Sequence, residues 1–241
     1  MKRWNLVVMA AVIGIAAVCS SCIIAIAPPI MGNGIIRTSE RTVASFNKIN
    51  ISGSAEVRFY ESQEHRVSVT VDSNLDEYTD VYVSGNVLNI RTRNGHTYSF
   101  TKLLIDVYCP VVTGVSVSGS GYFEGTDTII TPVFAADISG SGRIGGKIEC
   151  ESFSAKVSGS GRITVTGNSE YSNVSISGSG SFNGDAFMVN TAVVNISGSG
   201  NAYIYAVNNL KADISGSGTV HYRGNPQVDS KVSGSGRVKK I

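Results

Sequence analysis

The sequence predicts an all-β fold, a right-handed parallel β-helix with about 18 to 21 residues per coil, and three observations support it. The tetrapeptide Ser-Gly-Ser-Gly recurs seven times at intervals of 18 to 21 residues. Aliphatic and polar residues alternate on both sides of each copy. Glycine is abundant, at 27 of 241 residues. The interval is too short for a strand-helix-strand unit of roughly 30 residues, so each repeat is expected to form one coil of a solenoid.

Each repeat carries the same pair of buried columns. The residue before every corner is Ile or Val, the residue two positions earlier is nearly always small or aliphatic, and the residue between them is polar. This period-two alternation predicts a strand with one buried face. The pairs, beginning at the variant copy Ser52-Gly53-Ser54-Ala55, are Ile49 and Ile51, Val115 and Val117, Ala136 and Ile138, Ala155 and Val157, Val174 and Ile176, Val194 and Ile196, Ala212 and Ile214, and Ser230 and Val232.

The tetrapeptide itself predicts a corner between two strands, because the alternation resumes directly after it. Glycine adopts backbone angles that a Cβ forbids, which suits it to stacked bends. We expect about three short strands and three bends in each coil. The predicted corner glycines are Gly119, Gly121, Gly140, Gly142, Gly159, Gly161, Gly178, Gly180, Gly198, Gly200, Gly216, Gly218, Gly234 and Gly236.

Stacking the coils also places charged residues beside one another on the outside. Asp137 is expected next to Lys156, and Asp213 next to Lys231. Such neighbours of opposite charge contribute about 0.2 to 1 kcal/mol each.

Residues 41–115 are less regular than the tandem repeats of residues 116–241. The alternation predicts strands over 56–61, 66–72, 80–93 and 103–108, with Ser84-Gly85-Asn86 forming a turn inside the third. These strands form either N-terminal coils with longer excursions or a small sheet that caps the solenoid. The first alternative is favoured because Ser52-Gly53-Ser54-Ala55 has the same buried columns.

Residues 1–22 have the order of an export signal. Lys2 and Arg3 precede the apolar stretch 6–18, and small residues lead to Cys22. This order resembles a bacterial lipoprotein signal, in which Cys22 becomes the acylated first residue of the mature chain. The alternative is an uncleaved membrane anchor over residues 6–27, close to the ~20 residues that a bilayer requires. Residues 23–40 are expected to form a flexible tether.

Two cysteines remain for the folded part, Cys109 and Cys150. An oxidising envelope would permit a disulfide between them, but sequence alone does not place their backbones within bonding range. Because Cys150 lies on the inward parity of its segment, buried free thiols are the favoured state.

Composition and motifs exclude several kinds of partner. The formal net charge of +2 gives no electrostatic footprint for nucleic acid. Gly140 to Gly145 matches the dinucleotide pattern G-x-G-x-x-G, but no amphipathic helix follows it. The corners carry serine where calcium-binding β-rolls carry aspartate, and His65, His96 and His221 lack zinc-ligand spacing. We therefore expect no cofactor and no metal.

Catalytic residues are not evident either. A polysaccharide lyase or hydrolase, the main enzyme alternative, needs acids and bases gathered over adjacent coils. The nearest approach to such a group is Asp137, Lys156 and Arg162. Uncharged polar residues separate the charges in these outward columns, which favours a solvated face over a catalytic site. Exposed tyrosines are candidates for sugar or protein contacts, and the sequence does not choose among Tyr98, Tyr122, Tyr171, Tyr203, Tyr205 and Tyr222.

The phrase from Phe46 to Val57, the lipoprotein-like start and the tandem corners together resemble the family named putative auto-transporter adhesin, head GIN domain, over residues 41–241. The resemblance implies a secreted or surface β-helical domain of Gram-negative bacteria and supplies no catalytic residues. No autotransporter barrel follows Ile241, so the Cys22 lipid is the expected anchor.

The combined expectation is a non-enzymatic envelope protein, held at the outer membrane by its lipid and contacting a surface glycan or protein. The alternatives are a glycan-active enzyme and a periplasm-facing structural or sensory lipoprotein. The oligomeric state is left open.

Overall fold

The computed structural model describes residues 28–241, which are nearly all β. Apart from one 3-10 turn, η1 (Asp76–Tyr78), the regular elements of this part of the chain are strands. The chain divides into two units. Among the described residues, one contains 28–31 and Gly95–Ser99, and the other contains Gly32–Asn94 and Phe100–Ile241. In the first, β1 (Ile30–Met31) pairs in parallel with β8 (Tyr98–Ser99).

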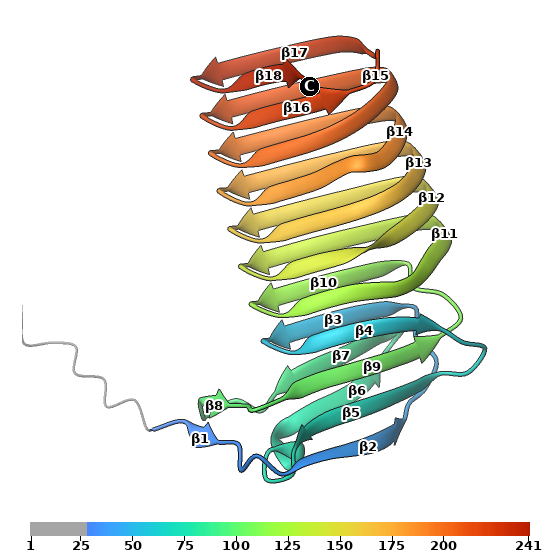
Figure 1. Ribbon diagram of the computed structural model, residues 1–241, viewed down its shortest axis with the longest axis vertical. Helices are drawn as coiled ribbons and strands as arrows, with labels where there is room; N and C mark the ends of the chain where they lie inside the picture. Colours follow the sequence, from blue (N-terminus) through green and yellow to red (C-terminus); the bar gives the residue numbers. More distant parts are fainter. Residues whose placement is uncertain (1–27) are drawn as a thin grey trace, which may run out of the picture. The chain divides into compact units, whose positions relative to one another are not determined.

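The second unit is a parallel β-solenoid of about 7 turns with ~19 residues per turn. Figure 1 shows its coils stacked in chain order. The predicted fold class and repeat length are confirmed. The strands of the regular part are β10 (Gly114–Gly119), β11 (Tyr122–Gly140), β12 (Arg143–Gly159), β13 (Arg162–Gly178), β14 (Ser181–Gly198), β15 (Asn201–Gly216), β16 (Thr219–Arg223), β17 (Gln227–Gly234) and β18 (Arg237–Lys240).

The expected three short strands per coil are not found. Strands β11 to β15 each run for 16 to 19 residues from one corner to the next. Parallel pairing continues around the bend opposite the corner, where irregularities such as the register shift between Gly125 and Ile129 absorb the curvature. Each coil therefore has one sharp corner and one smooth arc.

Corner and arc divide the solenoid surface into two walls (Figure 1). We call the strand segments that leave a corner the outgoing wall; they begin at residues such as Tyr122, Arg143 and Arg162. We call the segments that run into a corner the return wall; they end at glycines such as Gly140 and Gly159.

The two glycines of a corner meet different constraints. The first has a positive φ in every copy, from 108° at Gly119 to 124° at Gly216. Its carbonyl also accepts a backbone bond from the next coil, as in Ser160 N–H to Gly140 O at 2.9 Å. The second glycine lacks room: a Cβ on Gly161 would lie 2.5 Å from Ile138 Cγ2. Conformation and close stacking together require the pattern.

The N-terminal part mixes two kinds of pairing. Its strands are β2 (Ile36–Thr42), β3 (Lys48–Gly53), β4 (Glu56–Glu61), β5 (Arg66–Asp72), β6 (Thr79–Ser84), β7 (Val87–Thr92) and β9 (Leu103–Cys109), so the strands predicted here are confirmed. Strands β3 and β4 join at the variant corner and stack in register on β10 and β11. Strands β7 and β9 extend the parallel stack, whereas β2, β5 and β6 pair antiparallel.

The core lies between the walls and is built from the predicted columns. Ile51, Val117, Ile138 and Val157 are almost fully buried. Phenylalanines add to these columns, and Phe134 and Phe153 stack with ring centroids 6.2 Å apart and an interplanar angle of 6°. Burying a side chain of this size stabilises the fold by about 1.5 to 3 kcal/mol.

The predicted signal, Cys22 and the first part of the tether lie outside the described residues. Within 28–241, no helix has the length and apolar character needed to cross a bilayer.

Candidate ligand-binding surface

The outgoing wall presents its polar side chains in two aligned columns, because parallel pairing places equivalent residues of successive coils side by side. The first column contains Tyr122, Arg143, Arg162, Ser181, Asn201, Thr219 and Arg237, and the second contains Glu124, Gly145, Thr164, Asn183, Tyr203, His221 and Lys239.

A depression of about 540 Å³ lies where the second column has no side chain, at Gly145. A Cβ on Gly145 would collide with the Glu124 carboxylate, which lies across the glycine. Arg143, Lys147 and Arg162 provide cationic groups around the depression. Arg143 and Arg162 are adjacent in register, and both are exposed.

Tyr122 closes one side of this depression. Its hydroxyl donates a hydrogen bond to Glu124 Oε2. Burial, this bond and the Glu124 charge raise the pKa of Tyr122 to about 12. The phenol is therefore a protonated hydrogen-bond donor at neutral pH.

A second depression of about 500 Å³ continues along the same wall. It shares Arg162 and Thr164 with the first, so the two form one continuous feature, which we call the polar strip. The residues that line the second depression are Arg162, Thr164, Ser181, Asn183, Asp185, Asn201 and Tyr203. From Tyr122 on β11 to Tyr203 on β15 the strip crosses four coil steps, about 19 Å at ~4.8 Å each.

An aromatic pair marks the far end of the polar strip. Tyr203 stacks on His221 with ring centroids 4.7 Å apart and an interplanar angle of 9°. The strip thus offers hydroxyl, amide, carboxylate and guanidinium groups between two tyrosines. Such a set can orient a polar ligand by hydrogen bonds and contact its apolar faces with the rings.

Carboxylates gather beside the Tyr122 end of the strip. Strand pairing places Arg58 between Asp106 and Glu124 in one column. Arg58 donates two hydrogen bonds to Glu56 Oε1, at 2.9 and 2.6 Å. Burial raises the pKa of the Asp106 carboxyl, and the positive charge of Arg58 partly offsets this. The group contains three carboxylates, one guanidinium and the Tyr122 phenol on adjacent coils.

Sequence reasoning missed this carboxylate group. Its members come from residues 56, 58, 106, 122 and 124, and only the register of β4, β9 and β11 brings them together. The one signal available in the sequence was the alternation of charged with aliphatic residues in Glu56-Val57-Arg58, which indicates an outward charged column.

The return wall carries two shallow features of its own. Repeated serines and the polar column Lys156, Ser175, Asn195, Asp213 and Lys231 line a groove of about 620 Å³. Nearer the N-terminal part, a depression of about 550 Å³ lies beside Gly114 and Ala135. It is flanked by Tyr82 and by Asn50, whose amide donates to Asn89 at 3.2 Å.

The three charged residues singled out from the sequence do not gather. Asp137 and Lys156 are register neighbours on the return wall, as expected, and Asp213 neighbours Lys231 in the same way. Arg162 lies on the outgoing wall, across the corner from them. Asp137 and Lys156 therefore do not form one cluster of acids and bases with Arg162.

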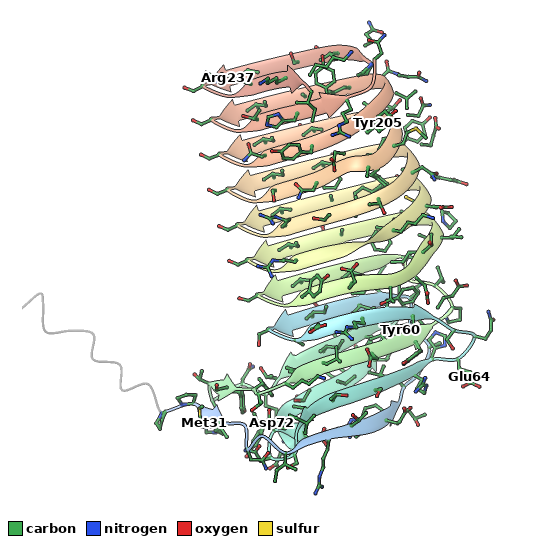
Figure 2. All side chains as sticks on the ribbon, in the orientation of Figure 1. Met31, Tyr60, Glu64, Asp72, Tyr205 and Arg237 are labelled. Carbon is green, nitrogen blue, oxygen red and sulfur yellow. The ribbon has the colours of Figure 1, made fainter. Side chains whose placement is uncertain are left out.

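The candidate tyrosines also separate. Tyr122 and Tyr203 belong to the polar strip, whereas Tyr171 lies near the arc with 57% of its surface exposed. Tyr205 is half-buried, on the arc side of β15 (Figure 2), and Tyr222 is half-buried in the inward column of Ile204. Tyr98 belongs to the smaller unit, where its ring contacts His96.

Cys109 and Cys150 are free thiols. Cys109 is fully buried, and burial raises its pKa to about 12. Cys150 is only half-buried, and burial also raises its pKa. Both are therefore poor nucleophiles at neutral pH. Residues 28–241 contain no group of three or more His, Cys, Asp or Glu side chains that could hold a metal ion.

Comparison with solved structures finds the same fold in proteins of Bacteroides and Parabacteroides. A putative adhesin from Bacteroides fragilis is 20% identical, with a TM-score of 0.84 over 88% of this chain and 100% of that one. A putative lipid binding protein from Parabacteroides distasonis is 26% identical, with a TM-score of 0.77 over 89% and 100%. A putative adhesin from Parabacteroides merdae is 25% identical, with a TM-score of 0.73 over 89% and 100%.

Comparison with curated proteins gives no match. The family model described as putative auto-transporter adhesin, head GIN domain, matches residues 45–226, which is well over half of the 241 residues. The matched region contains the variant corner, the polar strip and the carboxylate group. The chain therefore belongs to the putative auto-transporter adhesin, head GIN domain family.

Proposed function

We propose that this protein is a non-enzymatic adhesin of the cell envelope that binds an extended glycan along the polar strip. Family membership supports an adhesin-like, envelope-associated role. The observation that carries the glycan proposal is the continuity of the two depressions through Arg162 and Thr164. A linear polymer that follows the solenoid axis meets a new coil, and an equivalent set of polar groups, about every 4.8 Å.

The strip favours a glycan with acidic groups. Arg143 and Arg162 present adjacent exposed guanidinium groups, and guanidinium pairs well with carboxylate and sulfate in bidentate geometry. Tyr122 and Tyr203 supply ring faces for the apolar side of a sugar ring. Many weak contacts repeated along a rigid support suit adhesion better than tight capture of one small molecule.

Binding to an array of neutral and acidic glycans tests the proposal. The full chain in mild detergent should retain acidic polysaccharides, and Arg143→Ser combined with Arg162→Ser should weaken retention at least tenfold. Arg237→Ser is the matched control, because Arg237 occupies the same column in the last coil, beyond the strip (Figure 2). No ligand on the array, or equal loss in the control, would contradict the proposal.

The carboxylate group supports a second candidate, a glycan-active enzyme. A carboxyl with a raised pKa beside other carboxyl groups is an arrangement that general acid catalysis uses, and Asp106 is such a group. Polysaccharides incubated with the chain would then yield new reducing ends or unsaturated products. Loss of those products in Asp106→Asn, with binding retained, would replace the adhesin proposal by the enzyme.

For the anchor, we propose lipid attachment at Cys22. Mass measurement of the mature N-terminus distinguishes an acylated Cys22 from an uncleaved segment. Protease added to intact cells distinguishes a surface location, where the solenoid is cleaved, from a periplasmic one, where it is protected. Protection would remove the surface-adhesin proposal and leave a structural or sensory lipoprotein.

A further inference from the structure

The last strand of the return wall, β17, is left open. Among the described residues its strand partner is β15, which lies on one side of it. Every residue of β17 is exposed, including Val228 at 37% and Val232 at 44%. Their register partners one coil earlier, Leu210 and Ile214, are 1% and 3% exposed. The hydrophobic columns therefore end uncovered at β17, which is the last strand of the return wall in the stack (Figure 1).

An exposed strand edge with apolar inward residues is a template for pairing with another strand. The sequence of β17 is complementary to itself. Val228-Asp229-Ser230-Lys231-Val232 reads the same in both directions except that the two charges are opposite. When two copies pair antiparallel about Ser230, Val228 of one lies opposite Val232 of the other, and Asp229 of one lies opposite Lys231 of the other.

This pairing continues both patterns of the return wall. On the outside, Lys211 neighbours Asp229 and Asp213 neighbours Lys231. Lys211 and Asp213 also form an ion pair at 3.9 Å. A second copy placed about Ser230 extends the alternation, because Asp229 next meets a lysine and Lys231 next meets an aspartate. Cross-strand pairs of opposite charge stabilise a sheet, and like charges destabilise it.

On the inside, the same placement covers the valines. The column of Leu210 and Val228 continues into Val232 of the second copy, and the column of Ile214 and Val232 continues into its Val228. The side-chain period of a strand is two, so a slip of one residue would turn these valines outward. Charge and apolar pattern thus select the same register.

We propose that the open edge of β17 is a homodimer interface, with two copies paired antiparallel about Ser230. The neighbouring strand β18 carries Arg237, Lys239 and Lys240, which would repel their counterparts in a second copy. The contact is therefore confined to β17, and the dimer is reversible. A dimer presents two polar strips at once, which raises avidity for a polymeric ligand without a new contact.

Charge exchange tests the register. Sedimentation of the full chain in detergent should show a concentration-dependent dimer. Asp229→Lys and Lys231→Asp should each raise the dimer dissociation constant at least tenfold, because each places like charges opposite one another twice. A mixture of the two variants should form heterodimers, because the first variant carries two lysines at these positions and the second carries two aspartates. A tag on one variant detects the heterodimers.

The controls separate this interface from other causes. Asp137→Lys makes the same substitution as Asp229→Lys, but in the outward column of Lys231 and five coils earlier, and should leave dimerisation unchanged. Thermal melting of each variant reports whether the last coil still folds. Association that survives both charge variants, a wild-type chain that stays monomeric at several hundred micromolar, or two variants that fail to associate when mixed would each overturn the proposal.

A cysteine on the two-fold axis gives a second measurement. Residues directly opposite in an antiparallel pair have Cα atoms about 4.5 to 5.5 Å apart, within disulfide range. Ser230→Cys should form a disulfide-linked dimer on mild oxidation. The register places residue 233 opposite Gln227, so Ser233→Cys should form no more disulfide-linked dimer than the wild-type chain does. Equal cross-linking of both would contradict the register.

Discussion

Gly161 shows how little space a single residue has within the stacked corners. A Cβ at this position would lie 2.5 Å from Ile138 Cγ2 and 2.9 Å from the carbonyl oxygen of Gly142. Gly161→Ala should therefore cost about 1 to 3 kcal/mol, as expected for overpacking. Urea unfolding measures the loss. Ser175→Ala is the matched control on the outer face of the same coil and should stay within about 0.5 kcal/mol. Equal effects at both positions would contradict the stacked-corner geometry.

Asp72 is a buried carboxylate that holds backbone segments together. It accepts hydrogen bonds from the N–H groups of Gly34 at 2.9 Å, Thr101 at 2.8 Å and Lys102 at 3.4 Å. Burial alone would raise the pKa of Asp72, but the bonds from Thr101 and Gly34 outweigh it, so the pKa is lowered.

The lowered pKa of Asp72 predicts acid sensitivity. The unfolded chain binds a proton here at higher pH than the folded chain does, so the stabilisation is complete above the unfolded pKa and is lost as pH falls through the folded one. Asp72→Asn should lower the stability of the fold at pH 7, and the stability of the variant should fall less steeply than that of the wild type as the pH drops below about 4. Thermal melts between pH 2 and 7 measure both effects. An unchanged acid limb in the variant would show that Asp72 is not responsible.

At the scale of the element, strands β11, β12 and β14 are held together by phenylalanine rings that pack against one another in the core. Phe153 stacks on Phe134 and lies 4.9 Å from Phe187, ring centroid to ring centroid, so it joins three coils. Phe153→Ala should cost about 3 to 5 kcal/mol, the range for a buried ring replaced by a cavity. Urea unfolding measures the cost. Ile130→Ala, at a side chain 68% exposed near the arc, should change the free energy of unfolding by less than about 0.5 kcal/mol.

At the scale of the whole solenoid, stability should fall toward the C-terminal coil. A coil contacts only its neighbours, so a terminal coil opens by breaking one interface and a central coil by breaking two. Strand β13 pairs with β12 and β14, whereas β17 pairs with β15. Amides of β17 should exchange with deuterium at least tenfold faster than those of β13 in dilute solution. Uniform protection along the solenoid would contradict this one-dimensional behaviour.

The sequence was most informative where a local rule repeats. Alternation with a period of two, combined with the interval of 18 to 21 residues, was enough to predict the inward columns, the corners and the pairing of Asp137 with Lys156. It did not predict that one strand runs the length of a coil, because parallel pairing continues through the arc with register shifts, and glycines there, such as Gly146 and Gly167, do not end the strand.

The candidate sites show the same limit. The polar strip combines outward residues that alternation identifies one by one, but its first depression depends on the side chain missing at Gly145 and on the Glu124 carboxylate that lies across it. The carboxylate group depends on the stacking of β9, β4 and β11. Local pattern fixes which way a side chain faces, and long-range register fixes which side chains meet.

By itself, then, the sequence determined an all-β solenoid of repeated coils with serine-glycine corners and a polar exterior, since period and alternation are local properties of the chain. Tertiary structure alone decided that each coil has one corner and one arc, that Glu56, Asp106 and Glu124 come together on adjacent coils, and that β17 is left as an open edge. These features depend on pairing between residues distant in the chain, and such pairing is set by the packing of the whole stack.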